Sequence, residues 1–138
     1  AKSYDFTAAN PQMYTNDGNV FFYGGPASGG NGGHVVFDSG TLTIKGGSGN
    51  ITFAGNIASD AGAGTDEIVS FDTSGTITVK GIGGSSKIAS VGLEGGTVSL
   101  GGAITTQGAA GVVVTGNATI AADTTITTTT PVKDDYTR

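Results

Sequence analysis

The chain has 138 residues, of which 12% are charged, 26 are glycine and none is cysteine, and its formal net charge is −5. This length suits one domain, and so little charge argues against an ordinary disordered chain. The six basic residues are scattered, so we expect no nucleic-acid partner, and no apolar stretch is long enough to predict insertion in a membrane.

Residues 1–33 concentrate the large aromatic side chains and carry turn signals such as Asn10-Pro11. We interpret this segment as an N-terminal cap over the first repeat or as a surface that docks another subunit. In the docking interpretation the contact residues are Tyr4, Phe6, Tyr14, Phe22 and Tyr23.

A glycine-led pattern then recurs along the chain. Close copies occupy residues 40–46 (GTLTIKG), 49–55 (GNITFAG), 75–81 (GTITVKG) and 96–102 (GTVSLGG), with looser copies at 18–24 and 116–120. Apolar and polar residues alternate inside each copy, which is typical of a half-buried strand. The predicted inward residues are Val20, Phe22, Leu42, Ile44, Ile51, Phe53, Ile77, Val79, Val98 and Leu100.

The copies begin at residues 18, 40, 49, 75, 96 and 116, and three of the five steps are close to 21 residues. Such a repeat indicates a solenoid, because one repeat cannot bury its apolar side alone. We therefore predict an all-β chain forming a right-handed parallel β-helix of about five to seven coils over residues 34–130. The copies at 40 and 49 are two sides of one coil, and residues 131–138 are a polar tail. A β-sandwich is the structural alternative.

The longest loop, residues 59–67, carries the candidates for a weak ion site. Asp60, Asp66 and Glu67 offer carboxylate oxygens, the ligands that calcium prefers. Neither an EF-hand nor a calcium-binding nonapeptide repeat is present, so we expect no cofactor, and bound calcium is the alternative. Zinc would need several His or Cys ligands, whereas the chain has His34 alone.

Catalytic signals are weak. One histidine and no cysteine exclude the usual nucleophilic triads. Glycosidases need clustered carboxylates, but most acids stand singly in the sequence, as Asp38, Asp72, Glu94 and Asp123 do. We predict that the chain is not an enzyme, and a polysaccharide-active β-helix enzyme is kept as an alternative.

The outward positions of the repeat are mostly threonine and asparagine. We expect them to align into one polar ladder made of Asn19/Phe21, Thr41/Thr43, Asn50/Thr52, Thr76/Thr78, Thr97/Ser99 and Asn117/Thr119. Such a ladder resembles those of ice-binding proteins, so ice binding is a further alternative. Threonine is also simply favoured on outward strand faces, and the unequal coil lengths argue against a flat lattice.

The C-terminal run 124–130 is threonine-rich, uncharged and β-prone, and Pro131 ends it. Unpaired strand edges at the two ends of a solenoid invite pairing with another chain. We predict head-to-tail self-assembly, in which the aromatic residues listed above meet the edge of this run. The predicted contact residues of the run are Thr125, Thr127 and Thr129.

The stretch from Gly49 to Thr130 resembles the repeats of filamentous-haemagglutinin-like and autotransporter-type bacterial surface proteins. The matching segments are 49–57 (GNITFAGNI), 75–79 (GTITV), 101–108 (GGAITTQG) and 121–127 (AADTTIT). The resemblance implies a right-handed β-helix, an extracellular or cell-surface location, a structural or adhesive role, and no catalytic residues. We predict a non-enzymatic extracellular subunit that assembles into a surface or matrix fibre, and the alternative is an adhesin repeat that binds surface glycans.

Overall fold

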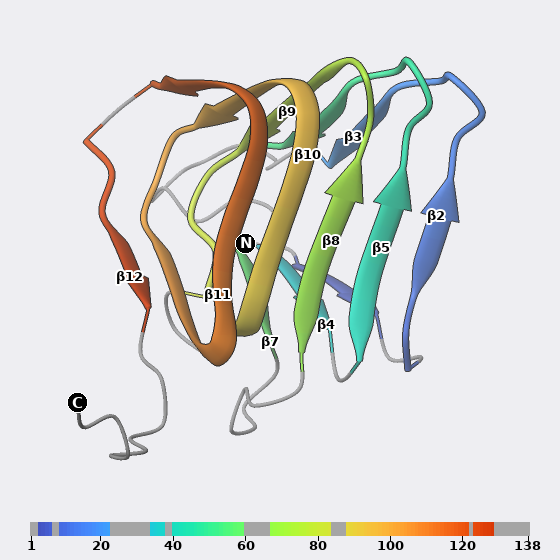
Figure 1. The fold of residues 1–138 in the computed structure, drawn as a ribbon. Helices are drawn as coiled ribbons and strands as arrows, with labels where there is room; N and C mark the ends of the chain where they lie inside the picture. Colours follow the sequence, from blue (N-terminus) through green and yellow to red (C-terminus); the bar gives the residue numbers. More distant parts are fainter. Residues whose placement is uncertain are drawn as a thin grey trace.

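The computed structural model describes residues 3–6, 9–22, 34–37, 40–59, 67–83, 88–121 and 123–128, which form strands and no helix (Figure 1). The described part of the chain accordingly contains no helix able to cross a bilayer. The strands are β1 (Ser3–Phe6), β2 (Gln12–Tyr14), β3 (Val20–Phe22), β4 (His34–Phe37), β5 (Thr41–Lys45), β6 (Ile51–Phe53), β7 (Ile57–Ser59), β8 (Ile68–Asp72), β9 (Thr76–Val79), β10 (Ile88–Leu100), β11 (Ile104–Ile120) and β12 (Ile126–Thr128).

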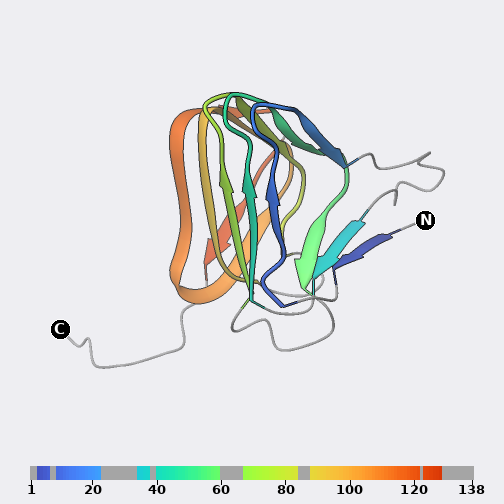
Figure 2. The same ribbon diagram turned by 90° about the vertical axis from the view of Figure 1, so that its right-hand side faces the viewer.

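These strands pair in three groups. The first group holds β1, β4 and β7, and continues through single bridges at Ile82 to the start of β11 and to β12. The second holds β2, β5, β8, the first part of β10 and the middle of β11. The third holds β3, β6, β9, the second part of β10 and the end of β11. The chain visits the groups in this order each time, and the strands curl around an interior (Figure 2).

Every pair of described strands is parallel. A β-sandwich is built largely from antiparallel pairs, so the parallel pairing favours the predicted β-solenoid over the β-sandwich alternative. Parallel neighbours need a long crossover connection, and here the other two groups supply it. The all-β prediction is confirmed, and the curled parallel arrangement is consistent with a β-solenoid.

One apolar cluster fills the interior of the curl. Nine of the ten predicted inward residues are 8% exposed or less, and Phe22 is half-buried against the same cluster. The rings of Phe22, Phe53 and Phe71 stack with centroid separations of 4.6 and 5.0 Å. Burial of each large apolar side chain contributes roughly 1.5–3 kcal/mol to the stability of the fold. The alternating apolar positions of the sequence therefore form the core.

Five of the six glycines that begin a copy occupy one corner, between the second and third groups, whereas Gly40 lies before β5 at the corner between the first and second groups. A Cβ on Gly75 would lie 2.7 Å from the carbonyl oxygen of Gly49, and a Cβ on Gly49 would collide with the carbonyl of Gly18. Gly116 meets Gly95 in the same way. Successive passages of the backbone approach each other so closely here that no side chain fits, which explains why the pattern begins with glycine.

The predicted single ladder needs one correction. β5 pairs with β2 and β8, so Thr43 lies beside Gln12 and Ser70 in the second group and not beside the other threonines. The reason is the turn at residues 46–49, where the amide of Gly49 donates to the carbonyl of Gly46 at 2.8 Å. This turn places the copies at 40–46 and 49–55 in different groups, as expected for two sides of one coil.

The described part of residues 1–33 belongs to the same three groups. β1, β2 and β3 pair in parallel with β4, β5 and β6, respectively. The segment therefore repeats the layout of the passage that follows it, and its role as a cap stays a prediction.

Candidate functional site

The two ends of the strand stack are its most distinctive surfaces. At the first edge, β1, β2 and β3 each pair with a described strand on one side only. At the last edge, residues 111–120 of β11 pair only with β10, and β12 pairs only with β11, within the described residues. Strand edges of this kind present backbone N–H and C=O groups for pairing with another strand.

Inward side chains are uncovered at the last edge. Leu100 is 2% exposed, whereas its partner one strand further along, Ile120, is 59% exposed. Ala118, the neighbour of the fully buried Val98, is likewise exposed. The apolar interior that is closed along the stack is therefore open at this end.

The first edge is apolar as well. Met13 and Phe22 are half-buried against the core, and Val20 is buried. On the outward side, Tyr14 and Phe21 are both exposed. The first edge thus offers large apolar side chains in the same two groups that are open at the last edge.

Side-chain oxygens bridge successive passages at the corners. The amide of Asn50 donates to Oδ1 of Asn19 at 2.8 Å, and the amide of Thr76 donates to Oδ1 of Asn50 at 2.9 Å. Three bridges of the same form run from the amides of Thr41, Ser48 and Gly81 to the Oδ1 atoms of Asn10, Asp17 and Asn56. In all five, the acceptor lies nearer the first edge and the donor nearer the last edge. These bonds satisfy amides at corners, where the strand ladder does not.

The sequence pattern predicts Asn19, Asn50 and Asn117 only as outward polar residues. The signal that identifies their role is position, because Asn19, Asn50 and Asn117 each follow the glycine that begins a copy of the repeat. Asn117 is exposed and lies at the last edge.

A hydroxyl ladder does form on the outward side of the third group. Thr78 pairs with Thr52 and Ser99, and Ser99 pairs with Thr119. A parallel row runs from Thr76 through Thr97 to Asn117. Strand neighbours in such a ladder are about 4.8 Å apart, which gives an uncharged and regularly spaced hydroxyl surface.

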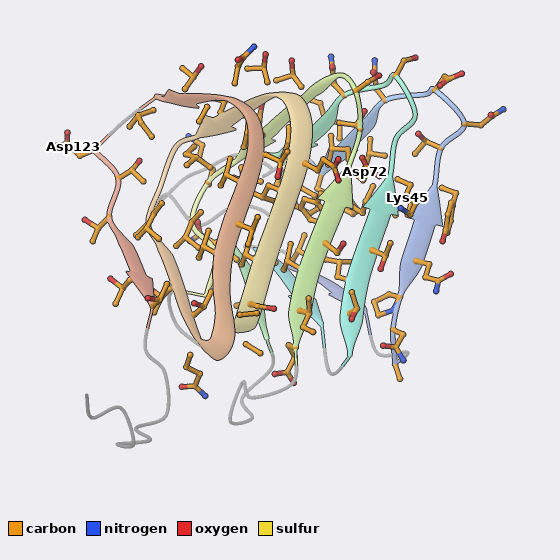
Figure 3. All side chains as sticks on the ribbon, viewed as in Figure 1. Lys45, Asp72 and Asp123 are labelled. Carbon is orange, nitrogen blue, oxygen red and sulfur yellow. The ribbon has the colours of Figure 1, made fainter. Side chains whose placement is uncertain are left out.

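A shallow depression of about 180 Å³ lies on the outward side of the second group. Its charged lining consists of Lys45, Asp72 and Glu94, which occupy paired positions on β5, β8 and β10. Lys45 Nζ lies 3.4 Å from Asp72 Oδ2 (Figure 3). Both side chains are about half exposed, and an ion pair of this kind contributes between about 0 and 1 kcal/mol.

The sequence pattern does not bring Lys45, Asp72 and Glu94 together. They are separated by 27 and 22 residues, which are close to one passage of the chain, so a register argument would have brought them together. Asp123, an isolated acid in the sequence, lies at the end of the stack that carries β12, away from Lys45 and Asp72 (Figure 3).

The predicted assembly residues that the structure describes lie on or next to strands at the two ends of the stack (Figure 1). Tyr14 and Phe22 lie on β2 and β3, and Thr127 is exposed on β12, with the exposed Thr125 just before that strand. Tyr4 and Phe6 are described through their backbone in β1. Tyr23 and Thr129 lie outside the described residues.

Of the three calcium candidates, only Glu67 lies within the described residues. Asp60 and Asp66 lie outside the described residues, and Glu67 is buried, with its backbone carbonyl accepting a hydrogen bond from the amide of Ala89 at 2.7 Å. No group of three or more potential metal ligands occurs within the described ranges. The calcium site stays a prediction.

Comparisons with protein-family models, with curated proteins and with solved structures find no match.

Proposed function

We propose that the chain is a non-enzymatic structural subunit that assembles head to tail into an extracellular or cell-surface fibre. In this proposal it is a right-handed β-solenoid whose described strands make five complete coils, the first of them formed by β1, β2 and β3, and β12 begins a sixth. Each subunit stacks its first edge on the last edge of another. The stacking continues the core from copy to copy.

The observation that carries the proposal is the uncovered interior at the last edge. Ile120 is 59% exposed at a position where the preceding strand buries Leu100 to 2%. Large exposed apolar surfaces mark contacts with other molecules. The first and last edges are two different surfaces, so their contact propagates into a filament or a ring and does not close a twofold dimer.

A structural role also agrees with the placement of the charged groups. Lys45 and Asp72 are about half exposed in an open depression, whereas catalytic carboxylates are tuned by burial and by enclosure from water. Incubation with acidic and neutral glycans, with detection of reducing sugars and unsaturated products, tests this part. Turnover that disappears when Asp72 or Glu94 becomes alanine would show that the chain is an enzyme.

A second candidate function is adhesion to surface glycans, and the hydroxyl ladder of the third group favours it. The ladder offers uncharged donors and acceptors at regular spacing, and these groups suit sugar hydroxyls. A glycan array probed with the wild-type chain and with a Thr78→Ala/Ser99→Ala double variant would separate this function from assembly. Adhesion through the ladder predicts a loss of binding in the variant without any loss of fibres.

Light scattering and electron microscopy of the folded protein test the structural proposal. Fibres should form as concentration rises. Deletion of residues 1–16, which removes β1 and β2, should abolish them while the remaining strands keep their β-sheet circular dichroism. A full-length chain that stays monomeric at high concentration, under conditions where it is folded, would refute the proposal.

A further inference from the structure

Resting on the proposed function, we infer that the contact between copies joins residues 112–120 of β11 in one copy to β2 and β3 of a second copy. In this contact Asn117 accepts a hydrogen bond from the backbone amide of the second copy's Asn19. The occupant of the open last edge is thus a second copy of the same chain, in the register that the second and third groups already have.

The direction of the corner bridges supports this register. Asn19, Asn50, Thr76, Thr97 and Asn117 occupy successive positions along the third group. Asn19 and Asn50 each accept the amide of the residue next toward the last edge, at 2.8 and 2.9 Å. Asn117 carries the same acceptor at the last position, and Asn19 is the first residue of the series. A stacked second copy would place the amide of its Asn19 where Asn117 needs a donor.

The apolar side chains of the two edges fit in the same register. Continuation of the third group places the second copy's Val20 over Ala118 and its Phe22 over Ile120. Continuation of the second group places its Met13 over Val114, which is partly buried against the core. Ile120, which is 59% exposed in the single chain, would thereby cover the half-buried ring of Phe22.

The contact between copies uses only the second and third groups, because the first group has no free position at the last edge. β12 already pairs with the start of β11, through Ile126 beside Ile104. In the stacked register, β1 of the second copy would fall on the level that β12 occupies. One of these two strands is therefore excluded, and removal of residues 1–8, which contain β1, should leave assembly intact.

Two neighbouring positions on β11 give a matched test. Ala118 and Thr119 are both exposed in the single chain, but Ala118 continues the inward row of Val98 and Thr119 continues the outward row of Ser99. Ala118→Asp should abolish assembly of the full chain, whereas Thr119→Asp, which adds the same charge, should still assemble. Asn117→Ala should raise the critical concentration about fivefold, because it removes one hydrogen bond of ordinary net strength.

The readouts are critical concentration by light scattering, fibres by electron microscopy, and the thermal transition of the monomer by circular dichroism. The monomer transition of Ala118→Asp should match that of Thr119→Asp. Equal assembly of the two variants, or loss of assembly in both, would overturn this contact although fibres of the wild type would still support the proposed function. A lowered monomer transition in Ala118→Asp alone would overturn it as well, because the chain's own residues would then cover the last edge. A wild-type chain that forms no fibres would instead refute the proposed function.

Discussion

Ile77 provides the sharpest test of the inward assignment. Its side chain is 0% exposed, between Ile51 and Val98 in the third group. A Cβ placed on Gly95 would lie only 3.2 Å from Ile77 Cδ1, so the surrounding backbone already packs tightly against this side chain. A cavity at this position would collapse poorly, and truncation to alanine costs about 2–5 kcal/mol in comparable cores.

We therefore expect Ile77→Ala to lower the free energy of unfolding by about 4 kcal/mol, in the upper part of that range. Ile77→Asp should prevent folding, because it buries an unpaired carboxylate. Thr78→Ala is the matched control, since Thr78 is the outward neighbour on the same strand, and its effect should stay within about 0.5 kcal/mol. Urea titration followed by circular dichroism measures all three. Equal losses for Ile77→Ala and Thr78→Ala, or a folded Ile77→Asp variant, would refute the assignment.

Three further substitutions test the corners and the core. Gly75→Ala should destabilise the chain by at least about 2 kcal/mol, because the added Cβ would press on the carbonyl of Gly49. The control Gly92→Ala, whose Cβ would meet only one carbonyl oxygen at 4.0 Å, should change stability by less than about 0.5 kcal/mol. Similar thermal transitions for the two variants would contradict the corner packing. Thr73→Val should lower the free energy of unfolding by about 1–3 kcal/mol, measured by urea titration, because the buried Oγ1 of Thr73 bonds to the carbonyls of Gly47 and Gly49. Thr73→Ser keeps the hydroxyl and should lower it much less. Equal effects of the two substitutions would show that the hydroxyl is not needed. Thr106→Val should raise the melting temperature, because the Oγ1 of Thr106 is buried without a hydrogen bond in the described residues; a lowered melting temperature would count against this reasoning.

The sequence predicted the core well because burial and alternation are local properties. Apolar residues such as Ile51, Ile77 and Val98 alternate with polar residues, each inside its own glycine-bounded segment. Their burial follows directly from that alternation. The same pattern could not identify the group to which a strand belongs. Residues 41–45 and 51–53 have the same alternation, yet they lie in different groups.

The register between strands of successive coils depends on the lengths of the loops that join them. The alternation of apolar and polar residues in one sequence does not determine these lengths. In the first group, Val35, Ile57, Ile82, Ile104 and Ile126 follow one another at separations of 22, 25, 22 and 22 residues. Because these separations are unequal, the sequence does not predict that Lys45, Asp72 and Glu94 form one row. For the same reason it does not predict that Asn117 lies at the end of the bridge series. The candidate sites were therefore less predictable than the core.

The axial rise per subunit, measured by cryo-electron microscopy of the assembled protein, tests head-to-tail stacking most directly. The second group contains five strands side by side, from β2 to β11, and strands are spaced about 4.8 Å apart. Head-to-tail stacking in the same register predicts strands perpendicular to the fibre axis and a rise of about 24 Å per chain. A rise of about 4.8 Å per chain, as in a fibril of flat stacked chains, would contradict the account, and so would a protein that forms no filament.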